Sequence, residues 1–281
     1  MKMKTIFLKF IALTSILFCT YSCDTKSRLN CVCLIDYSGS LTEETLKSYS
    51  EIITNTIFKN LNDVDRLIVI PIDEGAKTQA IKIAYEDLSA IDFSKATDGF
   101  THKQDSIKKR ISTHVETKLV ALYDEIINQK KLRKQFTDKT DIISAMEQVQ
   151  LLLENPKEDN FLTTLSNFVF GKPKLIPENV IIIFSDMIQE STDFNFAQLP
   201  DDATRFDEVL ENLIQNKRIP DLKLCSIFVD GRTGKSNSQV ENIKNFWIAY
   251  FKNSGGNLIS YDFDCRKDIE SFMQKRRELN K

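Results

Sequence analysis

The sequence predicts an α/β protein with a doubly wound, mainly parallel sheet of about six strands and helices on both faces. Short runs that are almost wholly apolar, such as Val32 to Ile35 and Val180 to Phe184, are typical of strands buried on both sides. Longer segments with apolar residues at helical spacing separate these runs. Strand and helix therefore alternate along the chain, which favours parallel strands joined by crossover helices.

Each element follows from its local pattern. The expected strands end at Asp36 or cover 66–72, 78–85, 180–186, 222–229 and 258–263, and the alternating segment 78–85 suits a sheet edge. The expected helices cover 41–59, a long polar stretch at 102–134, a segment that begins after Thr140, 204–216, 239–252 and the carboxyl terminus. A loop insert containing 160–170 precedes the strand that ends at Asp186.

The most informative motif is Asp36-Tyr37-Ser38-Gly39-Ser40, directly after the first apolar run. It offers one carboxylate and two hydroxyls at alternate positions, and Gly39 gives the backbone room to turn around a single point. Open α/β sheets bind their ligands at this carboxyl edge. Oxygen ligands of this kind suit a hard divalent cation such as Mg²⁺.

Two other segments bring oxygen ligands to the same edge. Thr140 precedes an amphipathic helix, and Asp186 ends a second buried run. Thr137 is a competing candidate for the hydroxyl, and Thr140 is preferred because helical spacing follows it directly.

These segments together resemble the von Willebrand factor A (VWA) family, whose metal-ion-dependent adhesion site (MIDAS) combines an Asp-x-Ser-x-Ser turn with a separate Thr and Asp. The resemblance covers about 30–281 and assigns the metal to Asp36, Ser38, Ser40, Thr140 and Asp186. The chain departs from many family members at Lys139 and Met187, where they have Gly. In the family the strands that end at the two Asp residues are neighbours, with the metal in the crevice between them.

The resemblance implies a binding protein of the cell envelope and no catalytic activity. A cation held mostly by hydroxyls and water stays electrophilic, so an Asp or Glu of a protein partner completes its shell; Mg²⁺, Mn²⁺ or Ca²⁺ fits this role. The loop 187–202 either lines the rim with Phe194 and Phe196 or folds them into the body. One alternative is a periplasmic metal-dependent hydrolase or phosphotransferase that uses Asp36 and Asp186. Another is a structural protein whose metal only fastens loops.

Other catalytic patterns fail. The segment 231–236 echoes a phosphate-binding loop, but Val229 stands where that motif needs its first Gly. Ser38 stands where an aspartate-based phosphotransferase typically has its second Asp. The only two His residues, His102 and His114, lie in the long polar helix and favour a surface role over activation of a serine.

The amino terminus predicts export. Lysines precede an apolar stretch at 10–19 that is too short to span a bilayer but suits a secretory signal. Ser22-Cys23 resembles a bacterial lipoprotein signal, with 1–22 removed, Cys23 lipidated, a linker at 23–29 and one domain at 30–281 that contains the helical insert 102–134. Thr20 and Tyr21 fit this signal imperfectly, so cleavage by the ordinary signal peptidase remains the alternative.

Composition and cysteine use limit the other partners. The formal net charge of -2 and the dispersed basic residues give no reason to expect nucleic acid. Cys31 and Cys33 share one face of the first strand and suit buried thiols. Cys225 lies in the expected strand 222–229, and Cys265 follows the neighbouring strand 258–263, so either a disulfide or two free thiols fits an oxidising compartment.

Overall fold

The computed structural model describes residues 27–39, 41–62, 65–74, 83–87, 101–136, 138–154, 176–199, 202–231 and 237–279. The main compact unit comprises Arg28–Pro156 and Pro177–Lys281. A second unit, Met1–Ser27 with Lys157–Ile176, lies almost entirely outside the described residues. The predicted signal, Cys23 and the insert 160–170 therefore also lie outside them.

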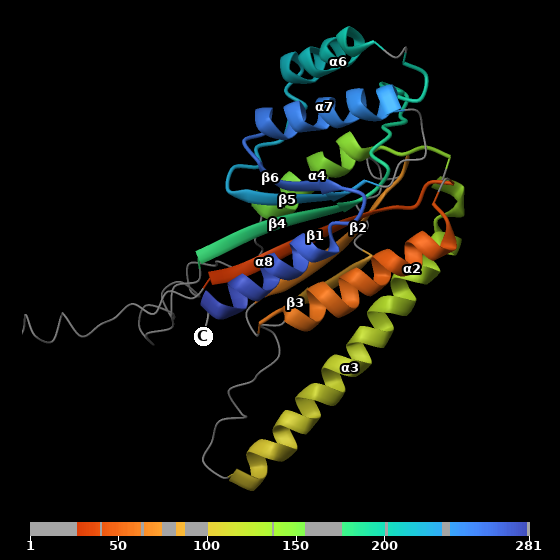
Figure 1. The fold of residues 1–281 in the computed structure, drawn as a ribbon. Helices are drawn as coiled ribbons and strands as arrows, with labels where there is room; N and C mark the ends of the chain where they lie inside the picture. The colour runs from red at the N-terminus through yellow and green to blue at the C-terminus, as the bar shows by residue number, and fades with distance from the viewer. Residues whose placement is uncertain are drawn as a thin grey trace, which may run out of the picture. The chain divides into compact units, whose positions relative to one another are not determined.

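The described strands form one six-stranded sheet in the order β3-β2-β1-β4-β5-β6 (Figure 1). Their bounds are β1 Ser27–Asp36, β2 Arg66–Ile72, β3 Ala84–Asp87, β4 Ile176–Phe184, β5 Cys225–Asp230 and β6 Asn257–Asp262. Five strands are parallel, and β3 is an antiparallel edge strand. The central strands β1 and β4 also run the same way, since Asn30 bonds Asn179 near their starts and Asp36 bonds Ser185 at their ends.

Helices cover both faces of the sheet, as the alternation of elements predicts (Figure 1). The bounds are α2 Glu43–Glu51, α3 Thr101–Leu132, α4 Ile142–Glu154, α6 Ala203–Gln215, α7 Asn237–Asn253 and α8 Arg266–Leu279. A π-helical stretch, Ile52–Ile57, and a 3₁₀ turn, Phe58–Asn60, extend α2. One core lies under α4, α6 and α7, and the other lies under α2, α3 and α8.

The apolar run of β1 supplies both cores because successive side chains of a strand point to opposite faces. Val32 and Leu34 pack with the first core, whereas Cys31, Cys33 and Ile35 pack with the second. The sulfur atoms of Cys31 and Cys33 lie 4.0 Å apart and are buried, as expected for two cysteines on one face. A continuous apolar run is therefore what a central strand needs here.

Several strand boundaries differ from the sequence prediction; for example, β3 continues to Asp87, beyond the expected end at 85. Two of the differences have a clear local cause. β4 ends at Phe184, so Ser185 and Asp186 lie in the turn that follows it. β5 begins at Cys225 because 222–224 forms a turn, in which the Cys225 amide donates to the Leu222 carbonyl at 3.0 Å. Both differences arise because side chains and turns near a strand end compete with its ladder of hydrogen bonds.

Cys225 and Cys265 are free thiols at opposite ends of the β5–β6 pair. Cys225 begins β5, whereas the Cys265 thiol donates to the Val229 carbonyl, at 2.9 Å, near the other end. The stretch from Cys225 to Val229 spans about 13 Å at the rise of a strand. A disulfide needs Cα atoms within about 7 Å, so this pairing does not form in the fold.

Leu224 has an unfavourable conformation for a leucine. Its φ is 64°, in the left-handed region, and its side chain is 91% exposed. Left-handed backbone costs a residue with a Cβ about 1–2 kcal/mol. Because its side chain is exposed, it contributes almost no hydrophobic stabilisation to the described fold.

Replacing Leu224 with Gly is therefore expected to raise the free energy of unfolding by up to about 1 kcal/mol, because glycine removes the backbone strain at some cost in chain entropy. Denaturant titration measures the change. The matched control is Leu151→Gly, since Leu151 is 51% exposed but lies within α4. That variant is expected to lose about 1 kcal/mol, and equal losses in both variants would contradict the strain at Leu224.

Candidate functional site

Asp36 closes β1 at the carboxyl edge of the sheet and is only 3% exposed. Its Oδ1 accepts the Ser38 amide at 2.8 Å, and its Oδ2 accepts the Ser185 hydroxyl at 2.8 Å. The Ser38 hydroxyl also bonds this carboxylate, and two carboxylate oxygens together can accept about four hydrogen bonds. The carboxylate is thus fixed in orientation while retaining the capacity to bind a further ligand.

Asp186 lies next to this carboxylate in the turn after β4. Its Oδ1 accepts the Ile188 amide at 2.9 Å, and its side chain is partly exposed. Burial and the negative charge of Asp186 raise the pKa of Asp36 to about 7, and burial is the larger cause. The structure therefore brings together the two carboxylates that the sequence assigns to the site.

Ser185 connects the two strand ends. Its hydroxyl donates to Asp36 and accepts the Met187 amide at 3.0 Å, while its own amide donates to the Asp230 carbonyl at 3.3 Å. The sequence analysis did not assign Ser185 to the site. A hydroxyl directly before a carboxylate at a strand end is the signal that could have identified it.

Met187 adopts a left-handed backbone with a φ of 61°. Its amide bonds Ser185, and its carbonyl accepts the indole N–H of Trp247 at 2.8 Å. Its side chain is buried in the core under α7. Bonds on both sides of the residue and burial of the side chain thus hold a conformation that glycine would adopt more readily.

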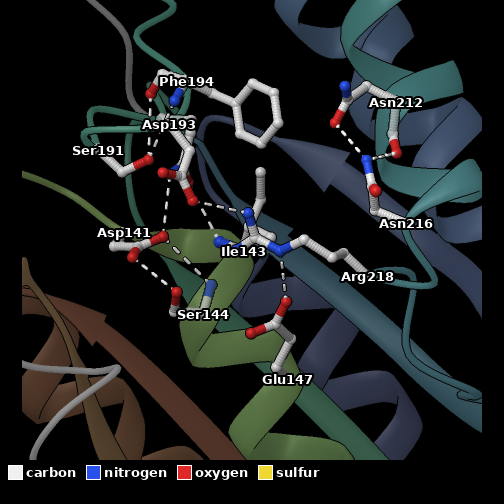
Figure 2. A network of polar contacts seen from close by, with 11 residues as sticks. Asp141, Ile143, Ser144, Glu147, Ser191, Asp193, Phe194, Asn212, Asn216 and Arg218 are labelled. Carbon is white, nitrogen blue, oxygen red and sulfur yellow. Dashed lines mark hydrogen bonds and ion pairs between the residues drawn. The ribbon is translucent and has the colours of Figure 1, made fainter.

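The Thr140 segment is fastened to the loop after Asp186. The Thr140 carbonyl accepts the Glu190 amide at 2.7 Å. Asp141 caps α4 through the Ser144 amide and hydroxyl, at 3.2 and 2.6 Å, as Figure 2 shows. Gln189 donates to Asp141 at 3.0 Å and accepts the Ile143 amide at 3.1 Å. The predicted third segment therefore lies beside the turn that carries Asp186.

The motif after β1 is only partly described. Ser38 is 5% exposed, and its carbonyl accepts the Leu41 amide at 3.1 Å, which closes the turn. Ser40 and the alternative Thr137 lie outside the described residues. The structure thus places Asp36, Ser38, Thr140 and Asp186 at one edge and leaves the position of Ser40 as a prediction.

Helix α3 and the residue that follows it support the ends of β1 and β2 through three contacts. The Tyr37 hydroxyl donates to the Ile126 carbonyl at 3.0 Å, and the Lys130 ammonium donates to the Leu41 carbonyl. Arg133 forms a buried two-point ion pair with Asp73, which directly follows β2. These partners are far apart in the sequence, so no local pattern indicated them.

The loop after Asp186 folds onto the body. Phe196 is fully buried, and its ring lies 4.7 Å from that of Phe246. Phe194 is partly buried under Arg218, whose guanidinium carbon lies 5.8 Å from the ring centre. Arg218 also pairs with Glu147 and Asp193, each at 2.9 Å, as shown in Figure 2. Of the two alternatives for this loop, the structure therefore favours the one that folds it onto the body, since Phe196 enters the core and Phe194 is partly buried.

Comparison of the sequence with known protein families and with curated proteins finds no match. Within the described part of the chain, no three side chains of His, Cys, Asp or Glu gather in a way that could hold a metal. The site described above differs in kind, since it combines two carboxylates with hydroxyls. None of the described helices is both long and apolar enough to cross a bilayer.

The raised pKa of Asp36 predicts a pH-dependent stability in the presence of a chelator. Between about pH 4 and 7 the folded state holds a proton that the unfolded state has released, so stability falls as the pH rises through this window. Asp36→Asn keeps the shape of the side chain without its charge. The free energy of unfolding of this variant should fall less than that of the wild type over the same window, with a difference of at most about 4 kcal/mol. Chemical denaturation at a series of pH values measures both curves.

The exposed carboxylate Asp264 provides the control for this experiment, since Asp264→Asn can still cap α8 through the Arg266 amide. Its curve should follow the wild type. Parallel curves for wild type and Asp36→Asn would show that Asp36 ionises normally in the folded protein.

Ser185→Ala is expected to lower the free energy of unfolding by about 1–3 kcal/mol, because it leaves the buried Asp36 Oδ2 and the Met187 amide each without a partner. Thermal and denaturant unfolding measure the loss. Ser191→Ala, which removes only local bonds to Phe194, should cost less. Equal losses in the two variants would show that the Ser185 bonds between β1 and β4 contribute no more to stability than the local bonds of Ser191.

Proposed function

We propose that Asp36, Ser38, Ser40, Thr140 and Asp186 hold a divalent cation through which the protein binds an Asp or Glu of a partner protein. The observation that carries the proposal is the pairing of Asp36 and Asp186 at the ends of two neighbouring parallel strands. We further propose that Cys23 bears lipid and anchors the domain in the bacterial envelope.

The residues present fit a hard cation such as Mg²⁺, Mn²⁺ or Ca²⁺. The two carboxylates lie close enough for the charge of Asp186 to raise the pKa of Asp36, after the larger effect of burial. A divalent cation between them would relieve this repulsion. Serine and threonine hydroxyls are hard oxygen donors as well, so the whole set favours Mg²⁺-like ions over soft metals.

The backbone after Asp186 supports the resemblance to the VWA family. Met187 takes the left-handed conformation at the position where many members of that family have glycine. Glycine adopts this conformation readily, and in this chain bonds to Ser185 and Trp247 hold Met187 in it. These contacts support the assignment of Asp186 as a site residue.

Electrostatics make the cation necessary for an acidic ligand. Further carboxylates occupy this edge, including the exposed Asp262 and Asp264 at the end of β6. An Asp or Glu of a partner would meet repulsion there without a bound cation. When bound, the cation would supply a Lewis-acidic position for a carboxylate oxygen, while Ser185 and the Ser38 amide hold Asp36 in place.

Binding explains the site better than catalysis does. Asp36 is held by Ser38 and Ser185, and the chain has only two His residues to act as a base near neutral pH. Recognition of a carboxylate needs only a fixed cation with an open coordination position. We therefore infer a metal-dependent binding or adhesion module.

Mg²⁺ or Mn²⁺ is expected to raise the melting temperature of the wild-type protein, because only the folded state assembles the ligands. Asp186→Asn should abolish this shift, whereas Asp264→Asn at the same edge should retain it. Water-proton relaxation with bound Mn²⁺ then tests whether the cation has an open coordination position. A peptide that contains Asp should displace bound water and lower the relaxivity. The same peptide with Asn in place of Asp should leave it unchanged.

Three results would count against this function. A cation shift that survives in Asp186→Asn would place the metal elsewhere. Relaxivity that the Asp peptide leaves unchanged would indicate a closed, structural metal. Metal-dependent turnover of p-nitrophenyl phosphate, lost in Asp36→Asn, would favour the hydrolase or phosphotransferase alternative.

A further inference from the structure

The two ends of the sheet differ in their chemistry. Strand ends at the carboxyl edge carry Asp36, Asp186 and Asp262. The amino edge collects the carboxyl ends of helices, since each crossover helix runs back toward the start of the next strand. Exposed basic residues occupy these helix ends at Lys59 and Lys252, and Arg277 lies in the last turn of α8.

Direct contacts confirm that α8 ends at the amino edge. Arg276 forms a buried two-point pair with Asp65, which directly precedes β2, at 2.7 Å for each bond. It also bonds Glu178 near the start of β4 at 2.9 Å. Its neighbour Arg277 lies within 3.4 Å of Asn60, beside Lys59. The basic residues are thus fixed at this end of the domain.

Leu224 belongs to the same edge. It directly precedes β5 and follows the exposed Lys223, which pairs with the exposed Asp221 at 2.9 Å. Leu224 combines a left-handed backbone with a side chain that is 91% exposed. Folding gains nothing from either property. An apolar side chain kept exposed on a strained turn, beside basic residues, is typical of a surface that meets an anionic, partly apolar partner.

The length of the linker identifies that partner. From Cys23 to Arg28 the chain reaches at most about 17 Å, even when it is fully extended. β1 has ten residues, so about 30 Å separates its start from Asp36. A lipid on Cys23 would therefore keep the start of β1 within about 17 Å of a bilayer. This distance excludes the inverted orientation, in which the Asp36 edge meets the bilayer and the start of β1 lies about 30 Å from it.

We infer that the amino edge, with Leu224 as its apolar tip and Lys59, Lys223, Lys252 and Arg277 around it, docks on an anionic membrane surface, so that the Asp36–Asp186 site faces away from the bilayer. This inference rests on the proposed lipid anchor at Cys23. It does not depend on whether the site holds a metal. The basic side chains would interact with anionic headgroups while Leu224 enters the interface.

Tryptophan placed at each edge tests the orientation. The full-length lipidated protein is purified from bacterial membranes and reconstituted into phosphatidylglycerol–phosphatidylcholine vesicles with or without brominated acyl chains. Leu224→Trp probes the amino edge, and Phe263→Trp is the matched control, because Phe263 is an exposed apolar residue directly after β6 at the carboxyl edge. The native Trp247 is fully buried and gives the background.

Brominated lipid is expected to quench roughly half of the emission added by Leu224→Trp and almost none of that added by Phe263→Trp. Pure phosphatidylcholine vesicles should reduce the quenching at position 224. Equal quenching of the two variants, stronger quenching at position 263, or none at position 224 would overturn the orientation.

Failure of the anchor would appear before any fluorescence is measured, as equal recovery of wild type and Cys23→Ala in the aqueous phase. That result would overturn the inference while leaving metal binding intact. Metal binding is measured separately by the Mg²⁺-dependent melting shift, so its failure would leave the membrane orientation standing.

Discussion

The hydrogen bond from the Ser185 hydroxyl to the Asp36 carboxylate is the contact on which the rest of the site depends. It joins the ends of β1 and β4, where the strand order reverses. Open α/β folds bind their ligands in the crevice at this point. The same hydroxyl accepts the Met187 amide, so it also sets the course of the turn that carries Asp186. A single small side chain thus orients one carboxylate and positions the segment that bears the other.

Supporting contacts come from both layers of helices. On one face, Trp247 of α7 holds the Met187 carbonyl, and Gln189 attaches the cap of α4 to the loop after Asp186. On the other face, α3 holds the turn after β1 through Tyr37 and the strand end after β2 through Arg133. Each element next to the two carboxylates is therefore tied to a rigid helix, which is the arrangement that a preorganised binding site needs.

Local sequence patterns were sufficient for most of the fold because the central strands are buried on both faces and so read as apolar runs. The same patterns identified Asp36 and Asp186, since each follows such a run directly. They failed where long-range packing decides the structure, since Phe196 enters the core and Arg133 pairs with Asp73. They also missed the local turn before Cys225 that shortens β5. Ser185 was overlooked for a different reason, because a buried serine acquires its role only when β1 lies beside β4.

The direction of the parallel strands also separates the two chemical tasks proposed for the molecule. Strand ends and the turns after them gather at one edge, so carboxylates placed there approach one another and favour a cation. Helix ends gather at the opposite edge, where basic side chains interact favourably with the negative ends of the helix dipoles. The charge pattern that stabilises an α/β fold therefore also gives it an acidic end for a cation and a basic end for an anionic surface. Helix dipoles account for the basic side chains at this edge but not for Leu224. This residue is uncharged and exposed, and its backbone conformation suits glycine. A single exposed apolar side chain is ordinary, so it is the combination with the strained backbone and the basic edge that makes Leu224 a candidate for contact with a membrane surface.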